Sequence, residues 1–141
     1  MKIVVDAMGG DKAPGVIIKG AIMAAREYDY HLILVGQEKA IKDVLRQEDY
    51  PEDRISICHA SDAIGMEEPA AVSVRKKRDS SIVRGIDLLK KGEADAFVSA
   101  GNTGAVVCAA TLSLRLLQGV DRPGIAVIFP TLGEPCMVLD V

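Results

Sequence analysis

The sequence predicts an α/β fold in three layers (α/β/α), with a mostly parallel sheet between two layers of helices. Two observations lead to this prediction. Short apolar, β-branched runs alternate along the chain with segments in which apolar residues recur every three or four positions. The strand-like runs are nearly continuous in apolar residues, which is typical of parallel strands covered on both faces. Such alternation favours parallel strands joined by right-handed crossovers.

The first two strand–helix units have clear local signals. A strand is expected at 2–7, and Pro14 suits the first turn of the helix that follows, because proline lacks the N–H that a helix start leaves unbonded. The next strand is expected at 31–36, followed by an amphipathic helix at 37–47. The predicted inward positions of the two helices are Ile18, Ala21, Ile22 and Ala25, and Ala40, Ile41, Val44 and Leu45.

The middle of the chain is predicted to continue with a strand and two helices. The strand is expected at 55–59, and after a loop a short helix begins at Pro69. Asp79 or Ser80 is expected to cap the next helix, and Gly92 is expected to end it.

The last part of the chain is predicted to hold three strands and one helix. A strand at 94–100 leads through a tight loop into a helix at 105–117, which is expected to be mostly buried because it has no charge before Arg115. Strands at 124–131 and 136–141 could pair as a hairpin, which would make the sheet mixed. Since the sequence stops inside an apolar run, we expect a single domain over 1–141 that is the N-terminal part of a longer protein.

Composition excludes several classes of protein. The chain has 141 residues, with 17 Lys and Arg against 20 Asp and Glu, so its net charge of −3 is unlike that of a basic nucleic-acid-binding domain. The sequence contains no run of 18 uncharged apolar residues, so it predicts no membrane span. Three widely spaced cysteines and two histidines predict neither a disulfide framework nor a metal site, and they fit a cytoplasmic protein.

Two glycine loops are the candidate ligand sites, because ligands of open α/β sheets bind outside the carboxyl ends of the strands. Both loops are expected at the same edge of the sheet. The first loop, DAMGGD at 6–11, lacks the Lys and Ser or Thr of a P-loop, since Val16 and Ile17 stand at those positions. Asp6 and Asp11 could orient a ligand there. The alternative is that Asp6 bonds loop amides and that Asp11 caps the following helix, which we favour for Asp11.

The second loop, SAGNTG at 99–104, is the better candidate for binding phosphate. Its glycines let backbone N–H groups approach an anion, and it opens directly into a helix N-terminus. Ser99, Asn102 and Thr103 add short polar side chains. The alternative is a simple turn with a threonine cap.

Three further features have both a functional and a structural interpretation. The basic run at 75–78 could bind phosphate or an acidic partner, but it more often marks a solvated helix end. His59 could titrate near neutral pH, although a structural role is favoured. Cys108 is expected to be an inert thiol in an apolar helix.

Five segments in order give the sequence a resemblance to a known family. They are DAMGGD at 6–11, IGMEEP at 64–69, VRKKRDSS at 74–81, ADAFVSAGNTGA at 94–105 and VLDV at 138–141. The chain resembles the bacterial phosphate acyltransferases of phospholipid synthesis, the acyl-acyl-carrier-protein:phosphate acyltransferases, along essentially its whole length. Members of that family are considerably longer.

The resemblance implies a fold like that of the isocitrate and isopropylmalate dehydrogenases and the phosphate acetyltransferases. It also implies an enzyme of fatty acid and lipid metabolism that converts acyl-acyl-carrier protein and inorganic phosphate into acyl phosphate. No cofactor and no metal are expected. The expected partners are acyl-carrier protein and a second copy in a homodimer, without nucleic acid. The location is expected to be the cytoplasm, with peripheral association at the inner face of the membrane.

The resemblance also suggests roles for the candidate residues. Ser99, Asn102 and Thr103 would be catalytic and hold phosphate or the oxyanion. The expected phosphate- or substrate-binding residues are Asp6, Gly9, Gly10, Asp11, Arg75, Lys76, Gly101 and Gly104. Two alternatives stay open: an enzyme that uses acyl-coenzyme A, and a folded but catalytically incomplete fragment. A dehydrogenase is supported only by the fold.

Overall fold

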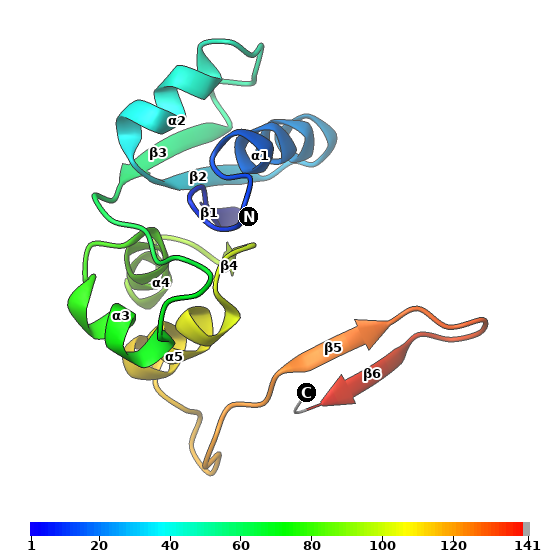
Figure 1. The fold of residues 1–141 in the computed structure, drawn as a ribbon. Coiled ribbons are helices and arrows are strands. Elements are labelled where there is room, and N and C mark those ends of the chain that lie inside the picture. The colour runs from blue at the N-terminus through cyan, green and yellow to red at the C-terminus, as the bar shows by residue number, and fades with distance from the viewer. Residues whose placement is uncertain (140–141) are drawn as a thin grey trace.

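Four parallel strands form the central sheet of the computed structural model, which describes residues 1–139. Their order is β3-β2-β1-β4 (Figure 1). The strands are β1 (Lys2–Asp6), β2 (His31–Gly36), β3 (Ile55–His59) and β4 (Ala96–Val98). In the register, Val5 of β1 lies opposite Leu34 of β2 and Val98 of β4. The predicted parallel sheet is therefore confirmed, and β1 is an inner strand.

Helices cover both faces of this sheet, as a three-layer fold requires (Figure 1). The helices are α1 (Gly15–Glu27), α2 (Glu38–Leu45), α3 (Ala70–Lys76), α4 (Ser81–Lys90) and α5 (Thr103–Leu114). α1 and α2 share one buried cluster with the sheet, and α4 packs against the opposite face. α5 packs mainly on α3 and α4.

The stripe predicted for α1 is confirmed. Its buried residues are Ile18, Ala21, Ile22 and Ala25. They pack with the strand side chains that point to the same face, among them Ile3 and Val5. Val4, between those two, points to the α4 face, as the two-residue period of a strand requires.

α4 begins and ends as the sequence indicates. The Ser80 hydroxyl accepts a hydrogen bond from the Val83 N–H at 3.4 Å, so Ser80 is the cap. Asp79 instead accepts from the Ser61 N–H at 2.9 Å, which joins α4 to the end of β3. After the helix, Gly92 takes a φ of 70°, the left-handed conformation that glycine adopts without strain.

The prediction that the helix at 105–117 is mostly buried is wrong. α5 ends at Leu114, and only Ala105 and Ala109 are buried along it. Leu112 and Leu114 are 55% and 44% exposed. The helix is apolar on every side, but only the side against α3 and α4 is covered within residues 1–139.

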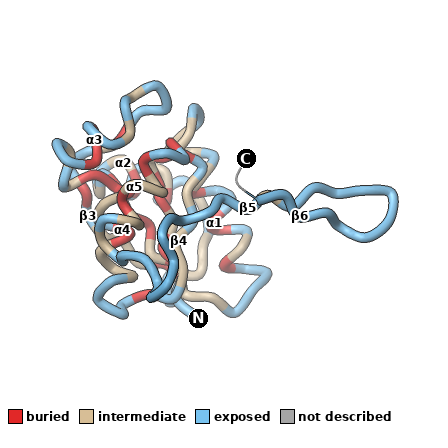
Figure 2. The backbone as a smooth tube through the Cα atoms, turned by 90° about the horizontal axis from the view of Figure 1, so that it is seen from below, coloured by how far each residue is buried: buried red, intermediate tan, exposed pale blue. Residues whose placement is uncertain are grey.

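A hairpin follows α5 and is separate from the central sheet. Its strands, β5 (Ala126–Phe129) and β6 (Cys136–Leu139), pair antiparallel with each other. The hairpin prediction is confirmed, but the four-stranded sheet stays wholly parallel because β5 and β6 form a sheet of their own. The hairpin projects from the body of the molecule and is exposed along almost all of its length (Figure 2).

Candidate functional site

The two glycine loops meet at one edge of the sheet. β1 and β4 are parallel neighbours, so the loops that follow them leave the sheet at the same edge. A Cβ atom added to Gly101 would lie only 3.1 Å from the Cα atom of Gly9. The predicted juxtaposition of the two loops is therefore confirmed.

A buried carboxylate lies beneath this contact. Asp6 is 1% exposed, and its Oδ2 atom accepts a hydrogen bond from the Ser99 hydroxyl at 2.7 Å. Its Oδ1 atom accepts from the Met8 N–H at 3.1 Å, and the Ser99 oxygen accepts from the Gly101 N–H at 3.0 Å. Asp6 therefore accepts a hydrogen bond from an amide of its own loop, which is one of the two roles that the sequence suggested. Through Ser99 it also binds the facing loop.

Both glycines of the first loop are required by close packing. A Cβ atom at Gly9 would lie 2.5 Å from Asp6 Oδ2 and 2.8 Å from the Gly101 nitrogen. Gly10 has a φ of +96°, and a Cβ atom there would lie 3.0 Å from the carbonyl oxygen of Ala100. No larger residue fits either position without moving a loop.

Asn102 uses both ends of its side chain within the protein. Its Oδ1 atom accepts from the Ala105 N–H at 3.0 Å, so Asn102, and not a threonine, caps α5. Its Nδ2 atom donates to the carbonyl oxygens of Gly65, Met66 and Glu68 at 3.2, 3.1 and 3.0 Å. A third loop, 61–69 after β3, is thereby tied to the start of α5.

Thr103 and Gly104 supply the first backbone N–H groups of α5. An α-helix leaves its first N–H groups without intrahelical partners, and both residues are exposed. A pocket of about 320 Å³ lies beside Thr103 and is lined by Phe97, Val98, Ser99, Gly101, Thr103 and Val106. Helix N–H groups and the helix dipole both favour an anion at such a place.

Glu68 lies at the centre of a cluster that sequence analysis missed. Its Oε1 atom accepts from Lys77 Nζ at 2.6 Å and from the Gly65 N–H at 2.9 Å. Its Oε2 atom accepts from the Ser73 hydroxyl at 2.8 Å. These bonds, that of Lys77 first, lower the pKa of the Glu68 carboxyl to about 2. Lys77 also donates to the Ala63 carbonyl oxygen at 2.8 Å.

The other predicted site residues lie farther from the loop contact. α3 meets Gly104 at its first turn, where a Cβ atom on Gly104 would lie 3.2 Å from Ala70 Cβ. Arg75 and Lys76 are exposed in the last turn of α3, about 8 Å farther along the axis at the usual helical rise. Asp11 is exposed, and the cap position of α1 belongs to Pro14 without a side-chain bond. The favoured interpretation of Asp11 as a helix cap is therefore wrong.

Comparison with known proteins shows the family to which the chain belongs. A family model described as "Fatty acid synthesis protein" matches residues 1–141. The chain belongs to this family. A phosphate acyltransferase of Geotalea daltonii is 48% identical over 141 residues, covering 100% of this chain and 41% of that protein. The phosphate acyltransferase of Alkaliphilus oremlandii is 47% identical over 131 residues, covering 93% of this chain and 39% of that protein.

The chain therefore spans about two fifths of the length of these members of the fatty acid synthesis protein family. Among solved structures, a phosphotransacetylase from Streptococcus pyogenes matches with a TM-score of 0.68 and 21% sequence identity. The match covers 97% of this chain and 45% of the phosphotransacetylase. At this identity the likeness shows the fold alone, and it confirms the predicted phosphate acetyltransferase-like architecture.

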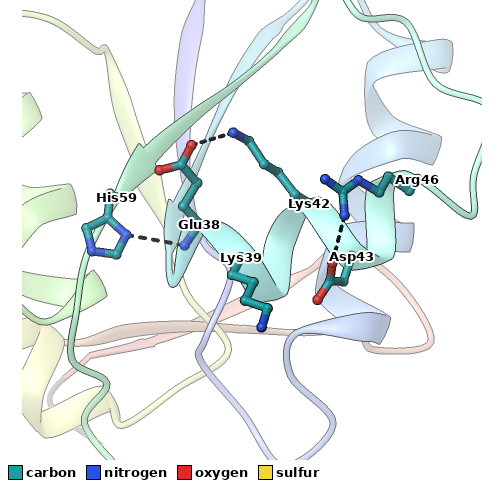
Figure 3. Close-up of a pocket in the computed structure, with 6 residues that line it drawn as sticks. All are labelled: Glu38, Lys39, Lys42, Asp43, Arg46 and His59. Carbon is teal, nitrogen blue, oxygen red and sulfur yellow. Dashed lines mark hydrogen bonds and ion pairs between the residues drawn. The ribbon is translucent and has the colours of Figure 1, made fainter.

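A second pocket, of about 370 Å³, lies at the opposite end of the sheet order, where β3 ends (Figure 3). His59 Nδ1 accepts there from the backbone N–H of Glu38 at 3.3 Å. Lys42 binds Glu38 at 2.6 Å, which lowers the pKa of the Glu38 carboxyl, and Arg46 binds Asp43 at 3.2 Å. Because most of its charges are paired within the pocket, the glycine loops remain the stronger candidate site in this member of the family.

Within residues 1–139, no cluster of three His, Cys, Asp or Glu side chains is arranged to hold a metal ion. No helix in the same range has both the length and the apolar character needed to cross a membrane.

Proposed function

We propose that this chain carries the phosphate site of an enzyme that transfers a long-chain fatty acyl group from acyl-carrier protein to inorganic phosphate. The product would be an acyl phosphate for phospholipid synthesis. The observation that carries the proposal is the contact of the two glycine loops beside Thr103 and Gly104, two exposed residues that supply the first N–H groups of α5. Relatives named phosphate acyltransferase support the reaction class.

The chemistry requires little base catalysis, because phosphate is already an anion. A phosphate oxygen attacks the thioester carbonyl carbon, and the carbonyl π electrons move to oxygen as the tetrahedral intermediate forms. When that intermediate collapses, the carbon–sulfur bond breaks and the carrier thiolate leaves, later taking a proton from water. The site must therefore orient phosphate and stabilise the transient oxyanion. N–H groups at the start of α5 suit both tasks.

The hydrogen bonds divide the candidate residues into two groups. The Ser99 proton is directed to Asp6, and Asn102 is engaged with loop carbonyls, so both are assigned to positioning in this proposal. The donors left for phosphate are the N–H groups of Thr103 and Gly104 and the Thr103 hydroxyl. Gly9 and Gly10 would let the first loop approach the bound anion.

The basic end of α3 is proposed as the surface that meets the carrier protein. Arg75, Lys76 and Arg78 are all exposed, while Lys77 between them is bound to Glu68. A group of exposed cations attracts an acidic partner and speeds its encounter more than it tightens binding. Homodimer formation, a cytoplasmic location and peripheral membrane association are further proposals that the family resemblance suggests.

The direct test is acyl-phosphate formation from palmitoyl-carrier protein and inorganic phosphate, followed by mass spectrometry of the product. The Geotalea daltonii relative named phosphate acyltransferase provides the comparison protein. We expect phosphate-dependent release of free carrier protein, and Asn102→Ala should reduce it. Turnover with palmitoyl-coenzyme A but not with the carrier substrate would contradict the proposed donor.

The alternative of a catalytically incomplete chain follows from the coverage of about two fifths of the relatives. On that alternative, phosphate would still shift the backbone N–H resonances of Thr103 and Gly104 in an NMR titration, without turnover. Absence of both turnover and shifts would contradict the proposed site itself.

A further inference from the structure

We propose that Asn102, Glu68 and Lys77 form a positioning clasp that holds loop 61–69 against the first turn of α5. The clasp would fix the N–H groups that the proposed function assigns to phosphate, so the inference rests on that function. None of the three residues is assigned a contact with substrate.

The first half of the clasp is the Asn102 side chain. Its amide nitrogen lies within 3.2 Å of the carbonyl oxygens of Gly65, Met66 and Glu68. At its other end, the amide oxygen receives the Ala105 N–H at 3.0 Å. One 9%-exposed side chain therefore joins the loop to the helix start, and movement of the loop is transmitted directly to α5.

The second half is the Glu68–Lys77 ion pair, which closes the loop on itself. The Glu68 carboxylate receives bonds from Lys77, Gly65 and Ser73, and Lys77 reaches across to the Ala63 carbonyl oxygen. The side chains of Glu68 and Lys77 are only about a third exposed, at 33% and 32%. Charge-assisted hydrogen bonds of this kind are stronger and more directional than neutral ones.

Hydrogen bonds and the ion pair hold this loop in place, because few apolar side chains of the loop are buried. Ile64 is buried, whereas Met66 is 46% exposed and Gly65 has no side chain. Without the clasp we expect the loop to leave α5 in a large fraction of molecules. The apparent affinity for phosphate then falls in proportion to the fraction that stays competent.

The chain offers a matched control for the carboxylate of the ion pair. Glu67 is the immediate neighbour of Glu68, carries the same charge and is exposed. Glu68→Gln and Glu67→Gln each remove one negative charge from the same loop. Simple electrostatics predicts that both substitutions tighten phosphate binding, whereas the clasp predicts that Glu68→Gln weakens it.

The experiment is a titration of ¹⁵N-labelled protein with inorganic phosphate, following the N–H resonances of Thr103 and Gly104. We expect Glu68→Gln and Lys77→Met to raise the phosphate dissociation constant about tenfold, with less than about a twofold change for Glu67→Gln. Lys77→Arg should restore part of the affinity, because a guanidinium can still reach the carboxylate. Circular dichroism of each variant would show that the fold persists.

A purely structural role would lower the melting temperature without changing the dissociation constant of the folded protein, and that outcome would overturn the inference. Equal effects of Glu68→Gln and Glu67→Gln would overturn it while leaving the phosphate site intact. If the unsubstituted protein shows no phosphate-dependent shifts, the proposed function fails and the clasp fails with it. Should Glu68→Gln not fold, Asn102→Ser tests the same point, since serine keeps a neutral capping oxygen for α5 and removes the amide donors to the loop.

Discussion

The buried carboxylate of Asp6 shows how one residue constrains its neighbours. Its oxygens are taken up by the Ser99 hydroxyl and the Met8 N–H, so the charge is satisfied although Asp6 is 1% exposed. Burial without such partners would be costly for a carboxylate. The bonds can form only because Gly9 brings the first loop within reach of Ser99 and Gly101.

This arrangement predicts that Gly9→Ala disrupts the loop contact. The added methyl group would lie 2.5 Å from Asp6 Oδ2 and 2.8 Å from the Gly101 nitrogen, so one loop must move. We expect a loss of about 2 kcal/mol in the free energy of unfolding, as for overpacked sites elsewhere. Urea denaturation followed by circular dichroism measures this change.

Gly15→Ala is the matched control, because nothing lies within 4 Å of the methyl group it would add. Gly15 is the first residue of α1, where alanine is as good as glycine or better. Equal stability of the two alanine variants would contradict the close packing of the glycine loops.

At the scale of the elements, helical glycines have opposite roles in α1 and α4. Gly20 lies on the exposed side of α1, and a Cβ atom there has nothing within 4 Å. Gly85 is buried in α4, where a Cβ atom would press into the Phe97 ring and approach Val4 Cγ1 to 3.2 Å. The sequence shows two glycines inside helices, and only packing against the sheet distinguishes them.

We therefore predict opposite effects of the same substitution. Gly20→Ala should stabilise the protein by about 1 kcal/mol through helix propensity. Gly85→Ala should destabilise it by about 1–3 kcal/mol, because α4 must move away from β1 and β4. Thermal and urea unfolding of the two variants side by side measure both signs. A gain in stability for Gly85→Ala would show that α4 is not held as close to the sheet as described.

The elements also show which features a single sequence can predict. The spacing of apolar residues was enough to predict the buried face of α1, because a helix that packs against a sheet buries the side on which its apolar residues recur. The meeting of the two glycine loops followed from the parallel order of the strands. The burial of α5 could not be predicted in the same way, since a helix that is apolar on every side does not indicate which side is covered.

The candidate site was predicted less completely, for a physical reason. The sequence indicates Asn102 as a polar residue in a glycine loop. The carbonyl groups to which its amide nitrogen donates lie 34 to 37 residues away, so no local pattern predicts them. Lys77 stands in a run of four cations, of which it alone binds Glu68. Sequence gives the charge of that run, whereas the turn of α3 decides which cation faces inward.

At the scale of the whole molecule, the core ends before the hairpin begins. The three clusters of buried apolar residues draw their members from the sheet, α1 to α5 and the loops between them, with none beyond Ala110 among the described residues. The hairpin instead exposes large apolar side chains, with Ile128, Leu132 and Met137 at 65%, 111% and 60%. The hairpin therefore exposes its apolar side chains and contributes nothing to the buried clusters among the described residues, and it is exposed along almost all of its length (Figure 2).

This separation predicts that ending the chain after Gly119 leaves the central domain folded. The free energy of unfolding should change by less than about 1 kcal/mol, because little apolar surface is buried between the hairpin and the core. Self-association should fall, since contiguous exposed apolar surface promotes it. Urea unfolding gives the first quantity and sedimentation velocity at several concentrations gives the second.

As a control that keeps the full length, Leu132→Ser should reduce self-association without changing the unfolding midpoint. Loss of cooperative unfolding in the shortened chain would instead show that the hairpin completes the core, and the four-stranded sheet with its five helices would not be an independent folding unit.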